Sequence, residues 1–145
     1  MSNVEKAVQC FINGSNCSQS IFSVYSALFG LDRETALKIA SGFGGGMGRN
    51  CETCGAVTGA YMIIGLKYGY TSPADKEGKE KTYALIREFS DRFKARNKST
   101  ACQDLLGVHL LTGDKEKAAQ QTKIICPQMV RDAAEILEEF LARPE

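Results

Sequence analysis

Cysteine is the residue type through which this chain could do chemistry. Three of its six cysteines, Cys17, Cys54 and Cys126, stand at the starts of predicted helices. Unpaired backbone N–H groups and the helix dipole stabilise a thiolate there and lower the cysteine pKa from about 8.5. The thiolate is the form that binds a metal or attacks a disulfide. The chain has one histidine, His109, which we expect to be a surface or half-buried polar residue. We therefore assign the candidate chemistry to sulfur.

The elements that must position these cysteines are helices. Apolar residues recur with helical periodicity along the chain, and no segment alternates as a strand does. The 145 residues suffice for one domain with a buried core. The sequence therefore predicts an all-α fold, a single-domain bundle of five to six helices over residues 1–145. The predicted helical segments are 3–13, 17–29, 33–41, 54–69, 73–97, 114–123 and 127–142, with a short turn near 102–106.

Capping residues set the predicted helix boundaries. Proline suits the first position of a helix, and this places Pro73 and Pro127 at the starts of their helices. A side-chain oxygen just before a helix accepts a hydrogen bond from its first turn. The expected N-caps are Ser2, which fits a capping box with Glu5, and Asn16, Asp32 and Ser72.

Two glycine-containing segments have distinct roles. The helix at 54–69 is apolar on nearly all sides, which is typical of a helix in the middle of a bundle. Gly55, Gly59 and Gly65 would let neighbouring backbones approach it closely. Residues 42–48 contain five glycines and must form a loop. The loop lacks the phosphate-binding glycine motifs. Two interpretations of this loop stay open. Its backbone N–H groups could solvate an anionic sulfur site, or the loop is a tight turn packed against the bundle.

A simple up-and-down topology brings cysteines together. The helices at 17–29 and 54–69 then start at the same end of the bundle, and the helix at 73–97 finishes there. Cys17, Cys54 and Cys102 could therefore converge, and Cys126 joins them if the short helix at 114–123 returns locally.

Simpler interpretations apply to the cysteines taken singly. A lone cysteine on an apolar stripe is usually a small buried hydrophobe. Cys10 lies off the apolar face of its helix, and we interpret it as incidental. Cys51 and Cys54 form a C-x-x-C, but a thioredoxin-like motif needs a βαβ setting and a zinc ribbon needs a second such pair. A four-thiolate site for zinc or for an iron–sulfur cluster, assembled from distant cysteines, stays open.

Composition excludes several classes of function. The 18 basic and 17 acidic residues leave a net charge of +1, so neither a nucleic-acid groove nor an anionic membrane surface is indicated. The longest uncharged apolar stretch, residues 53–66, is too short to span a membrane, and no signal peptide is visible. We therefore expect a cytoplasmic protein whose thiols are kept reduced.

Motifs along nearly the whole chain resemble a known family. The family consists of redox-active proteins with a C…CGAxxG…C…C cysteine pattern, found mainly in anaerobic bacteria. The resemblance rests on residues 14–20 (GSNCSQS), 44–48 (GGGMG), 54–60 (CGAVTGA), 102–107 (CQDLLG), 126–127 (CP) and 130–135 (VRDAAE).

The resemblance implies that Cys17, Cys54, Cys102 and Cys126 are the four family cysteines. Cys51 lies outside the pattern, at a position where relatives have glycine or another small residue. The family is also similar to a domain of split-Soret cytochromes, and this implies an iron–sulfur cluster. The chain has no C-x-x-C-H, so covalent haem is not supported.

Three hypotheses follow for the four-cysteine site. The leading one is an iron–sulfur cluster, bound by these cysteines, that transfers electrons to an unidentified redox partner protein. The second is reversible thiol–disulfide chemistry, and the third is a structural zinc site with no redox role. A homo-oligomer is compatible with each of them. We expect Cys51 to be dispensable for the cluster or for thiol reactivity, whereas Cys54 is required.

Overall fold

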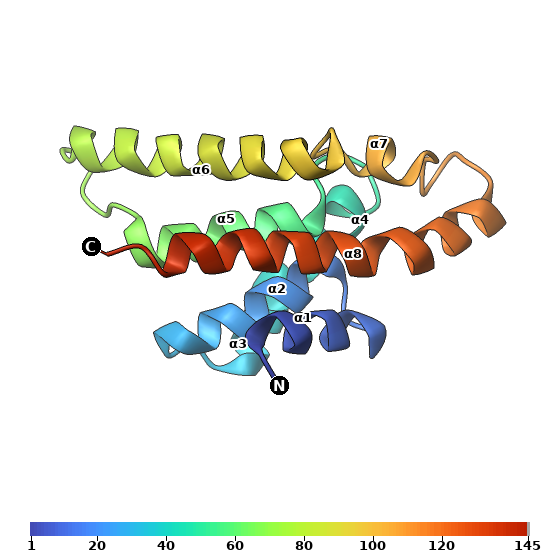
Figure 1. The fold of residues 1–145 in the computed structure, drawn as a ribbon, viewed down its shortest axis with the longest axis horizontal. Coiled ribbons are helices and arrows are strands. Elements are labelled where there is room, and N and C mark those ends of the chain that lie inside the picture. Colours follow the sequence, from blue (N-terminus) through green and yellow to red (C-terminus); the bar gives the residue numbers. More distant parts are fainter. Residues whose placement is uncertain (145) are drawn as a thin grey trace.

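The computed structural model describes residues 1–144, and within that range it is built from helices without strands (Figure 1). The all-α prediction is confirmed. No helix of the described chain is long and apolar enough to cross a membrane. The helices are α1 (Asn3–Ile12), α2 (Cys17–Ser26), α3 (Arg33–Ala40), α4 (Gly44–Met47), α5 (Gly55–Tyr68), α6 (Lys76–Asn97), α7 (Cys102–Leu106) and α8 (Lys115–Leu141), with 3₁₀ turns η1 (Ala27–Phe29) and η2 (Ser41–Phe43).

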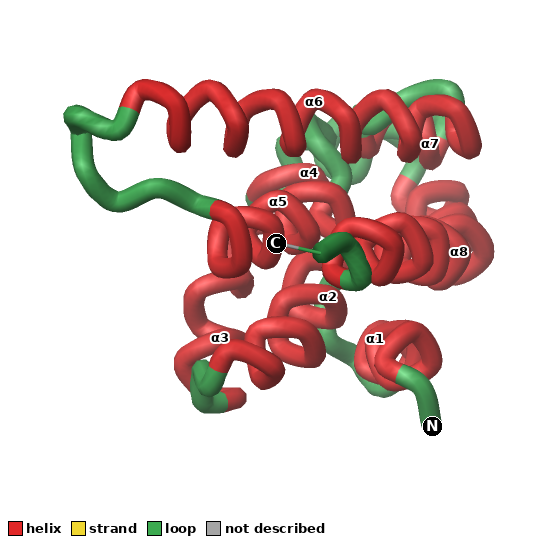
Figure 2. The backbone as a smooth tube through the Cα atoms, turned by 60° about the vertical axis from the view of Figure 1, so that its left-hand side comes forward, coloured by secondary structure: helices red, strands yellow, loops and turns green. Residues whose placement is uncertain are grey.

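The helices form three layers around α5 (Figures 1 and 2). The middle layer holds α5 beside α8, with α6 on one side of it and α1, α2 and α3 on the other. Because α5 packs against α2, α6 and α8, it needs apolar side chains on nearly every side. The prediction that this helix lies in the middle of the bundle is confirmed.

Aromatic and branched side chains fill the core between these layers. Phe89 of α6 packs with a tilted ring against Phe140 of α8, at 5.8 Å between ring centroids. Tyr61 of α5 meets Phe89 edge-on at 5.9 Å. The other large, fully buried side chains include Tyr25, Ile21, Val57, Ile63, Ile64, Phe93, Val130, Ile136 and Leu137.

Capping residues begin the N-terminal helices as predicted, with one difference. The Asn16 side chain accepts from the Gln19 N–H, and the Gln19 side chain accepts from the Asn16 N–H, which completes a capping box. Ser2 caps α1, but the predicted capping box is wrong because the Glu5 carboxylate pairs with Arg131 of α8 instead. That ion pair ties α1 to α8.

The long helix α6 begins later than predicted. The carboxylate of Asp75 accepts from the Gly78 N–H at 2.8 Å and caps the helix, so Lys76 is its first residue. Ser72, the predicted cap, instead accepts from the Ala74 N–H in the preceding turn. Pro73 therefore lies in that turn and not at the first position of the helix.

One helix replaces the two that were predicted at 114–123 and 127–142. The helix α8 runs without a break from Lys115 to Leu141 and holds Pro127 in its interior. Proline removes one helical hydrogen bond at that point. Buried residues on both sides of the proline, among them Ala118 and Val130, keep the helix continuous because each half packs against the rest of the protein.

The glycine-rich segment is a loop whose centre turns in the left-handed sense. Gly45, Gly46, Met47, Gly48 and Arg49 have φ values of 65°, 67°, 69°, 64° and 69°. Each residue with a side chain costs about 1–2 kcal/mol in this conformation, so a run of this kind needs glycine at most positions. The predicted loop is confirmed, and the turn labelled α4 lies within it.

Candidate four-cysteine site

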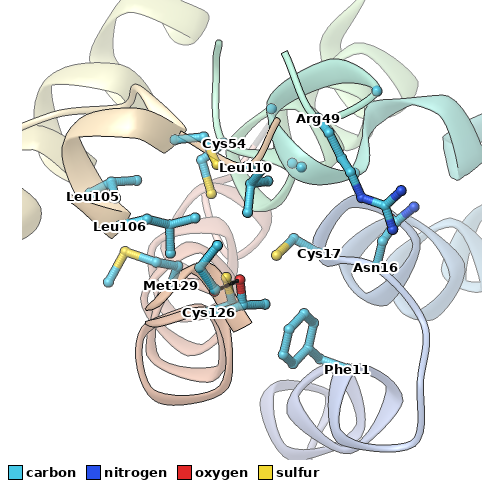
Figure 3. A pocket seen from close by; sticks show the side chains of 18 of the residues that line it. Phe11, Asn16, Cys17, Arg49, Cys54, Leu105, Leu106, Leu110, Cys126 and Met129 are labelled. Atoms are coloured by element: carbon cyan, nitrogen blue, oxygen red, sulfur yellow. Dashed lines mark hydrogen bonds between the residues drawn. The ribbon is translucent and has the colours of Figure 1, made fainter. Parts of the chain in front are cut away.

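Four cysteines line one cavity of about 810 Å³ between α2, the α4 turn, α5, α7 and α8. They are Cys17, Cys54, Cys102 and Cys126, and their residues are 7%, 5%, 7% and 8% exposed. Figure 3 shows the side chains of Cys17, Cys54 and Cys126 around this space, with Phe11, Leu110 and Met129 beside them. The structure thus brings together all four residues that the sequence selected.

The approach of α2 to α5 fixes Cys17 beside Cys54. Cys17 is the first residue of α2, and Cys54 immediately precedes α5. A Cβ atom on Gly55 would lie 2.9 Å from the Phe43 carbonyl oxygen and 3.2 Å from the Cys17 Cβ. Only glycine allows the two helix starts to meet this closely. The predicted close approach holds at Gly55, whereas nothing lies within 4 Å of a Cβ placed on Gly65.

A short antiparallel backbone contact holds Cys102 next to Cys54. The Cys102 N–H donates to the Glu52 carbonyl at 2.6 Å, and the Cys54 N–H donates to the Thr100 carbonyl at 2.8 Å. These bonds flank an isolated bridge between Thr53 and Ala101. The chain segments before α5 and before α7 therefore form one unit, and this unit carries two of the four cysteines.

Cys126 reaches the site from the interior of a helix. The sequence places it at a helix start, but α8 begins at Lys115, so that prediction is wrong. Figure 1 shows the first turns of α8 extending past the start of α5. This overhang brings the middle of α8, and not its N-terminus, to the cysteine cluster, so the dipole of α8 does not stabilise a Cys126 thiolate.

The thiols of Cys17 and Cys54 have opposite tendencies to ionise. A hydrogen bond with the Cys17 thiol lowers the pKa of Cys54, and N–H groups of Ala56 and Val57 at the start of α5 lower it further against the effect of burial. The pKa of Cys17 is raised well above its usual value by hydrogen bonds with Cys126 and Cys54 and by burial. The helix-start argument therefore holds for Cys54 and is wrong for Cys17, whose proton stabilises the neighbouring sulfur.

Cys51 is a fifth member of the cluster that the family pattern does not include. It is 4% exposed, and its Sγ accepts a hydrogen bond from the Leu110 N–H at 3.2 Å. It also contacts Cys102, whose pKa is raised first by burial and next by the nearby Cys51 and Cys54 sulfurs. The C-x-x-C spacing with Cys54 is the signal in the sequence that points to this residue.

The glycine turn packs directly under Cys51 and Cys102. A Cβ atom on Gly46 would lie 2.8 Å from the Cys102 Cβ, 2.8 Å from the Cys51 carbonyl carbon and 2.6 Å from the Glu52 nitrogen. Both the left-handed φ and this lack of space require glycine. The turn is thus packed tightly against the site, and Gly44, Gly45, Gly46 and Gly48 also line the cavity.

The remaining candidates lie outside the cluster. Cys10 on α1 is half-buried and does not line the four-cysteine cavity. His109 is half-buried, and its Nδ1 accepts from the Leu111 N–H at 3.1 Å, so it stabilises the turn after α7. The prediction of a half-buried polar role for His109 is confirmed.

The donor set fits a thiolate-bound group, although the sulfurs are not arranged around a single point. All six cysteines are free thiols. Within residues 1–144, no group of three or more Cys, His, Asp or Glu side chains is placed to hold one metal ion. A single zinc ion with Zn–S bonds of about 2.3 Å needs its sulfurs about 3.8 Å apart. The cysteine ligands of a cluster with several irons lie farther apart than those of a single zinc ion. The cavity between the four cysteines leaves room for such a cluster.

Comparison with known protein families gives a match over most of the chain. A family model described as "Putative redox-active protein (C_GCAxxG_C_C)" matches residues 15–140. In this chain the central motif reads Cys-Gly-Ala-Val-Thr-Gly, over residues 54–59. Neither the curated proteins nor the solved structures give a significant match.

Proposed function

Since the chain belongs to the C_GCAxxG_C_C family of redox-active proteins, we propose that its four cavity cysteines bind an iron–sulfur cluster for electron transfer. The observation that carries this proposal is the common cavity lined by Cys17, Cys54, Cys102 and Cys126. Four cysteine thiolates are the usual ligand set of [2Fe–2S] and [4Fe–4S] clusters. When bound, the cluster would supply reversible electron transfer.

Burial and hydrogen bonding around the sulfurs support this function. The four residues are less than a tenth exposed, so a bound group would be shielded from water. Backbone N–H groups of Ala56 and Val57 stabilise the Cys54 sulfur as an anion. Burial and hydrogen bonds to sulfur are two of the features by which a protein sets the reduction potential of a cluster.

The protein would work where thiols stay reduced, as in the cytoplasm. Its electron donor or acceptor would be another protein that approaches the mouth of the cavity, where Arg49 and Lys115 are exposed. These two cations favour a partner with an acidic contact surface.

A second candidate function is reversible thiol–disulfide exchange. The contact between Cys17 and Cys54, together with the lowered pKa of Cys54, favours it. Cys54 would be the attacking thiolate and Cys17 its partner. Neither sulfur needs a metal for this reaction.

The deciding experiment is a metal and sulfide analysis of protein purified without oxygen. We expect iron and inorganic sulfide in the protein as purified, or after reconstitution, with visible absorbance that bleaches on reduction. A Cys54→Ser variant should lose most of the iron, while the matched Cys10→Ser variant keeps it. Stoichiometric zinc without colour or sulfide would overturn the cluster, and metal-free protein with rapid thiol–disulfide cycling would establish the second candidate.

A further inference from the structure

The four-cysteine cavity is larger than the proposed cluster requires. Its volume of about 810 Å³ falls within the range of about 300–1,000 Å³ that is typical of pockets for small organic molecules. A [4Fe–4S] cluster contains only four iron and four sulfide atoms. Space therefore remains beside the cysteines, and the residues around it indicate what kind of molecule it fits.

The extra space follows the first turns of α8. The cavity-lining residues of this helix share one face, three or four positions apart, and are Lys115, Ala118, Ala119, Thr122, Cys126 and Met129. Lys115 begins α8, and Cys126 lies about three turns, or 16 Å, further along it. The cavity thus continues well beyond Cys126, beside the turns of α8 that extend past the start of α5 (Figure 1). We call this part the side lobe, and it lies between residues 115–122 of α8 and the leucines Leu105, Leu106 and Leu110.

The walls of the side lobe are apolar and held in place. The Gln121 side chain donates to the Leu106 carbonyl at 3.0 Å and fixes the end of α7 against α8. On α8, the small side chains of Ala118 and Ala119 leave the space open. The Thr122 hydroxyl donates to the Ala118 carbonyl at 2.8 Å, so its proton is not available to a ligand. The lobe therefore suits the apolar part of a molecule.

The charged side chains around the cavity are cationic. Arg49 and Lys115 line it, whereas no Asp or Glu does. Within residues 1–144, neither cation forms an ion pair. Figure 3 shows the Arg49 side chain reaching along the edge of the cavity toward Asn16. An occupant with a negative charge would complement this lining.

Lys115 is too far from Cys126 to stabilise the sulfur of that residue. It is exposed, and the charge of an exposed group is largely screened beyond about 8 Å at physiological ionic strength. The distance of about 16 Å along α8 is twice that length. Its position at the outer end of the side lobe instead suits the charged group of a ligand there.

We propose that the side lobe binds a small organic carboxylate, with its apolar body against the three leucines and its charge facing Arg49 and Lys115. The ligand's part in electron transfer rests on the proposed function, since it would lie next to the group through which electrons pass. Binding itself needs only the cavity walls and the two cations. An acidic partner protein would compete with the ligand for these cations.

The test measures the binding of phenylacetate to the reduced full-length chain by isothermal titration calorimetry. Phenylacetamide has nearly the same shape without the charge, and acetate has the charge without the apolar body. We expect phenylacetate to bind at least about fivefold more tightly than phenylacetamide, and acetate to show no measurable binding. Absence of phenylacetate binding, or an affinity no higher than that of either analogue, would overturn the proposal.

Filling the side lobe locates the ligand. Ala119 lines the cavity from an exposed position, so Ala119→Leu should block the lobe and remove most phenylacetate binding without overpacking the core. Gln120→Leu is the matched control, because its exposed neighbour does not line the cavity. Circular dichroism checks that both variants keep their helices. Unchanged binding in Ala119→Leu would place the ligand elsewhere, and the proposal would fail.

Removing one cation tests the recognition of charge. In Lys115→Gln, the affinity for phenylacetate should fall about two- to fivefold, while that for phenylacetamide stays the same. Lys117→Gln is the control, since Lys117 is exposed on the same turn of α8 but does not line the cavity. An equal loss in both variants would mean that only the net charge of the protein matters, contrary to the proposal.

Iron uptake separates this proposal from the proposed function. If phenylacetate binds as expected but the chain takes up no iron, the cluster fails and the ligand site stands. If the chain takes up iron but does not bind phenylacetate, the ligand site fails and the cluster stands. If Lys115→Gln loses iron but keeps its affinity for phenylacetate, this cation serves the cysteine site and the proposal is wrong.

Discussion

The N–H of Cys102 donates to the carbonyl of Glu52 at 2.6 Å, across about a third of the length of the chain. The companion bond from the Cys54 N–H to the Thr100 carbonyl completes a clamp between the segments that precede α5 and α7. Cys54 and Cys102 therefore cannot separate unless both backbone bonds break. The glycine turn that packs under this clamp is the first place to test it.

Replacing Gly46 with alanine should damage both stability and the site. The left-handed φ of 67° costs about 1–2 kcal/mol for a residue with a side chain, and the added Cβ would overlap the Cys102 Cβ. With this overpacking, we expect a loss of about 2–5 kcal/mol in the free energy of unfolding, measured by urea denaturation. Iron uptake should fall because Cys102 is displaced.

Gly48→Ala is the matched control for that variant. Gly48 has nearly the same φ, 64°, but nothing lies within 4 Å of a Cβ placed on it. Its replacement should cost only the conformational energy of about 1–2 kcal/mol and leave iron uptake unchanged. Equal effects of the two substitutions would show that the contact with Cys102 is unimportant.

Cys54 and Cys51 should differ in their importance for metal binding. Cys54 lines the cavity, and its sulfur accepts hydrogen bonds from backbone N–H groups at the start of α5. Cys51 contacts Cys102 and lies outside the family pattern. We expect Cys54→Ser to lose most bound iron and sulfide, and Cys51→Ser to keep both under anaerobic conditions. Iron loss in Cys51→Ser with full helicity by circular dichroism would make Cys51 a ligand.

Alkaline pH should destabilise the reduced, metal-free protein. Hydrogen bonds with Cys126 and Cys54, and then burial, raise the pKa of Cys17 in the folded state. A raised pKa contributes stability that is fully present below the unfolded value of about 8.5 and is lost as pH rises through the folded value. The urea midpoint should therefore fall as the pH rises beyond about 8.5.

Serine in place of Cys17 tests the origin of this effect. The hydroxyl does not titrate in the same range, so the alkaline fall of the urea midpoint should become shallower. Cys54 acts in the opposite sense, because its lowered pKa contributes stability that is lost as pH falls through the folded value. An unchanged slope in Cys17→Ser would assign the alkaline effect to other groups.

Pro127→Ala should stabilise the metal-free chain. Proline inside α8 leaves the Lys123 carbonyl without its helical N–H donor, and alanine restores that bond. We expect a gain of about 1–3 kcal/mol in the free energy of unfolding. Pro73→Ala is the control, since Pro73 lies in the turn before α6 and its replacement should change stability by less than about 1 kcal/mol. A destabilised Pro127→Ala would mean that the proline fixes the path of α8.

The sequence predicted the helical class and most helix starts because those depend on local patterns. Asn16 and Asp32 cap α2 and α3 through side-chain hydrogen bonds that involve residues only three positions away. The errors arose where two local signals compete or where packing decides. Asp75 wins over Ser72 as the cap of α6, and the buried face of α8 overrides the proline signal at Pro127.

The site followed partly from the sequence and partly from contacts that no local pattern contains. Helix starts indicated Cys17 and Cys54, and both line the cavity. Cys126 also lines the cavity, but the helix start that the sequence predicted for it does not exist. The contact of Cys51 with Cys102 depends on the long-range clamp and on the left-handed turn, neither of which a single sequence reveals.

The spacing of the four cavity cysteines has a consequence for biosynthesis. The ribosome adds roughly 5–20 residues per second, so Cys126 is translated roughly 5–20 s after Cys17. The nascent chain can pack α2 against α5 during that interval, but α8, the last of the elements that enclose the cavity, is still missing. The four-cysteine cavity is therefore complete only after translation has passed Cys126.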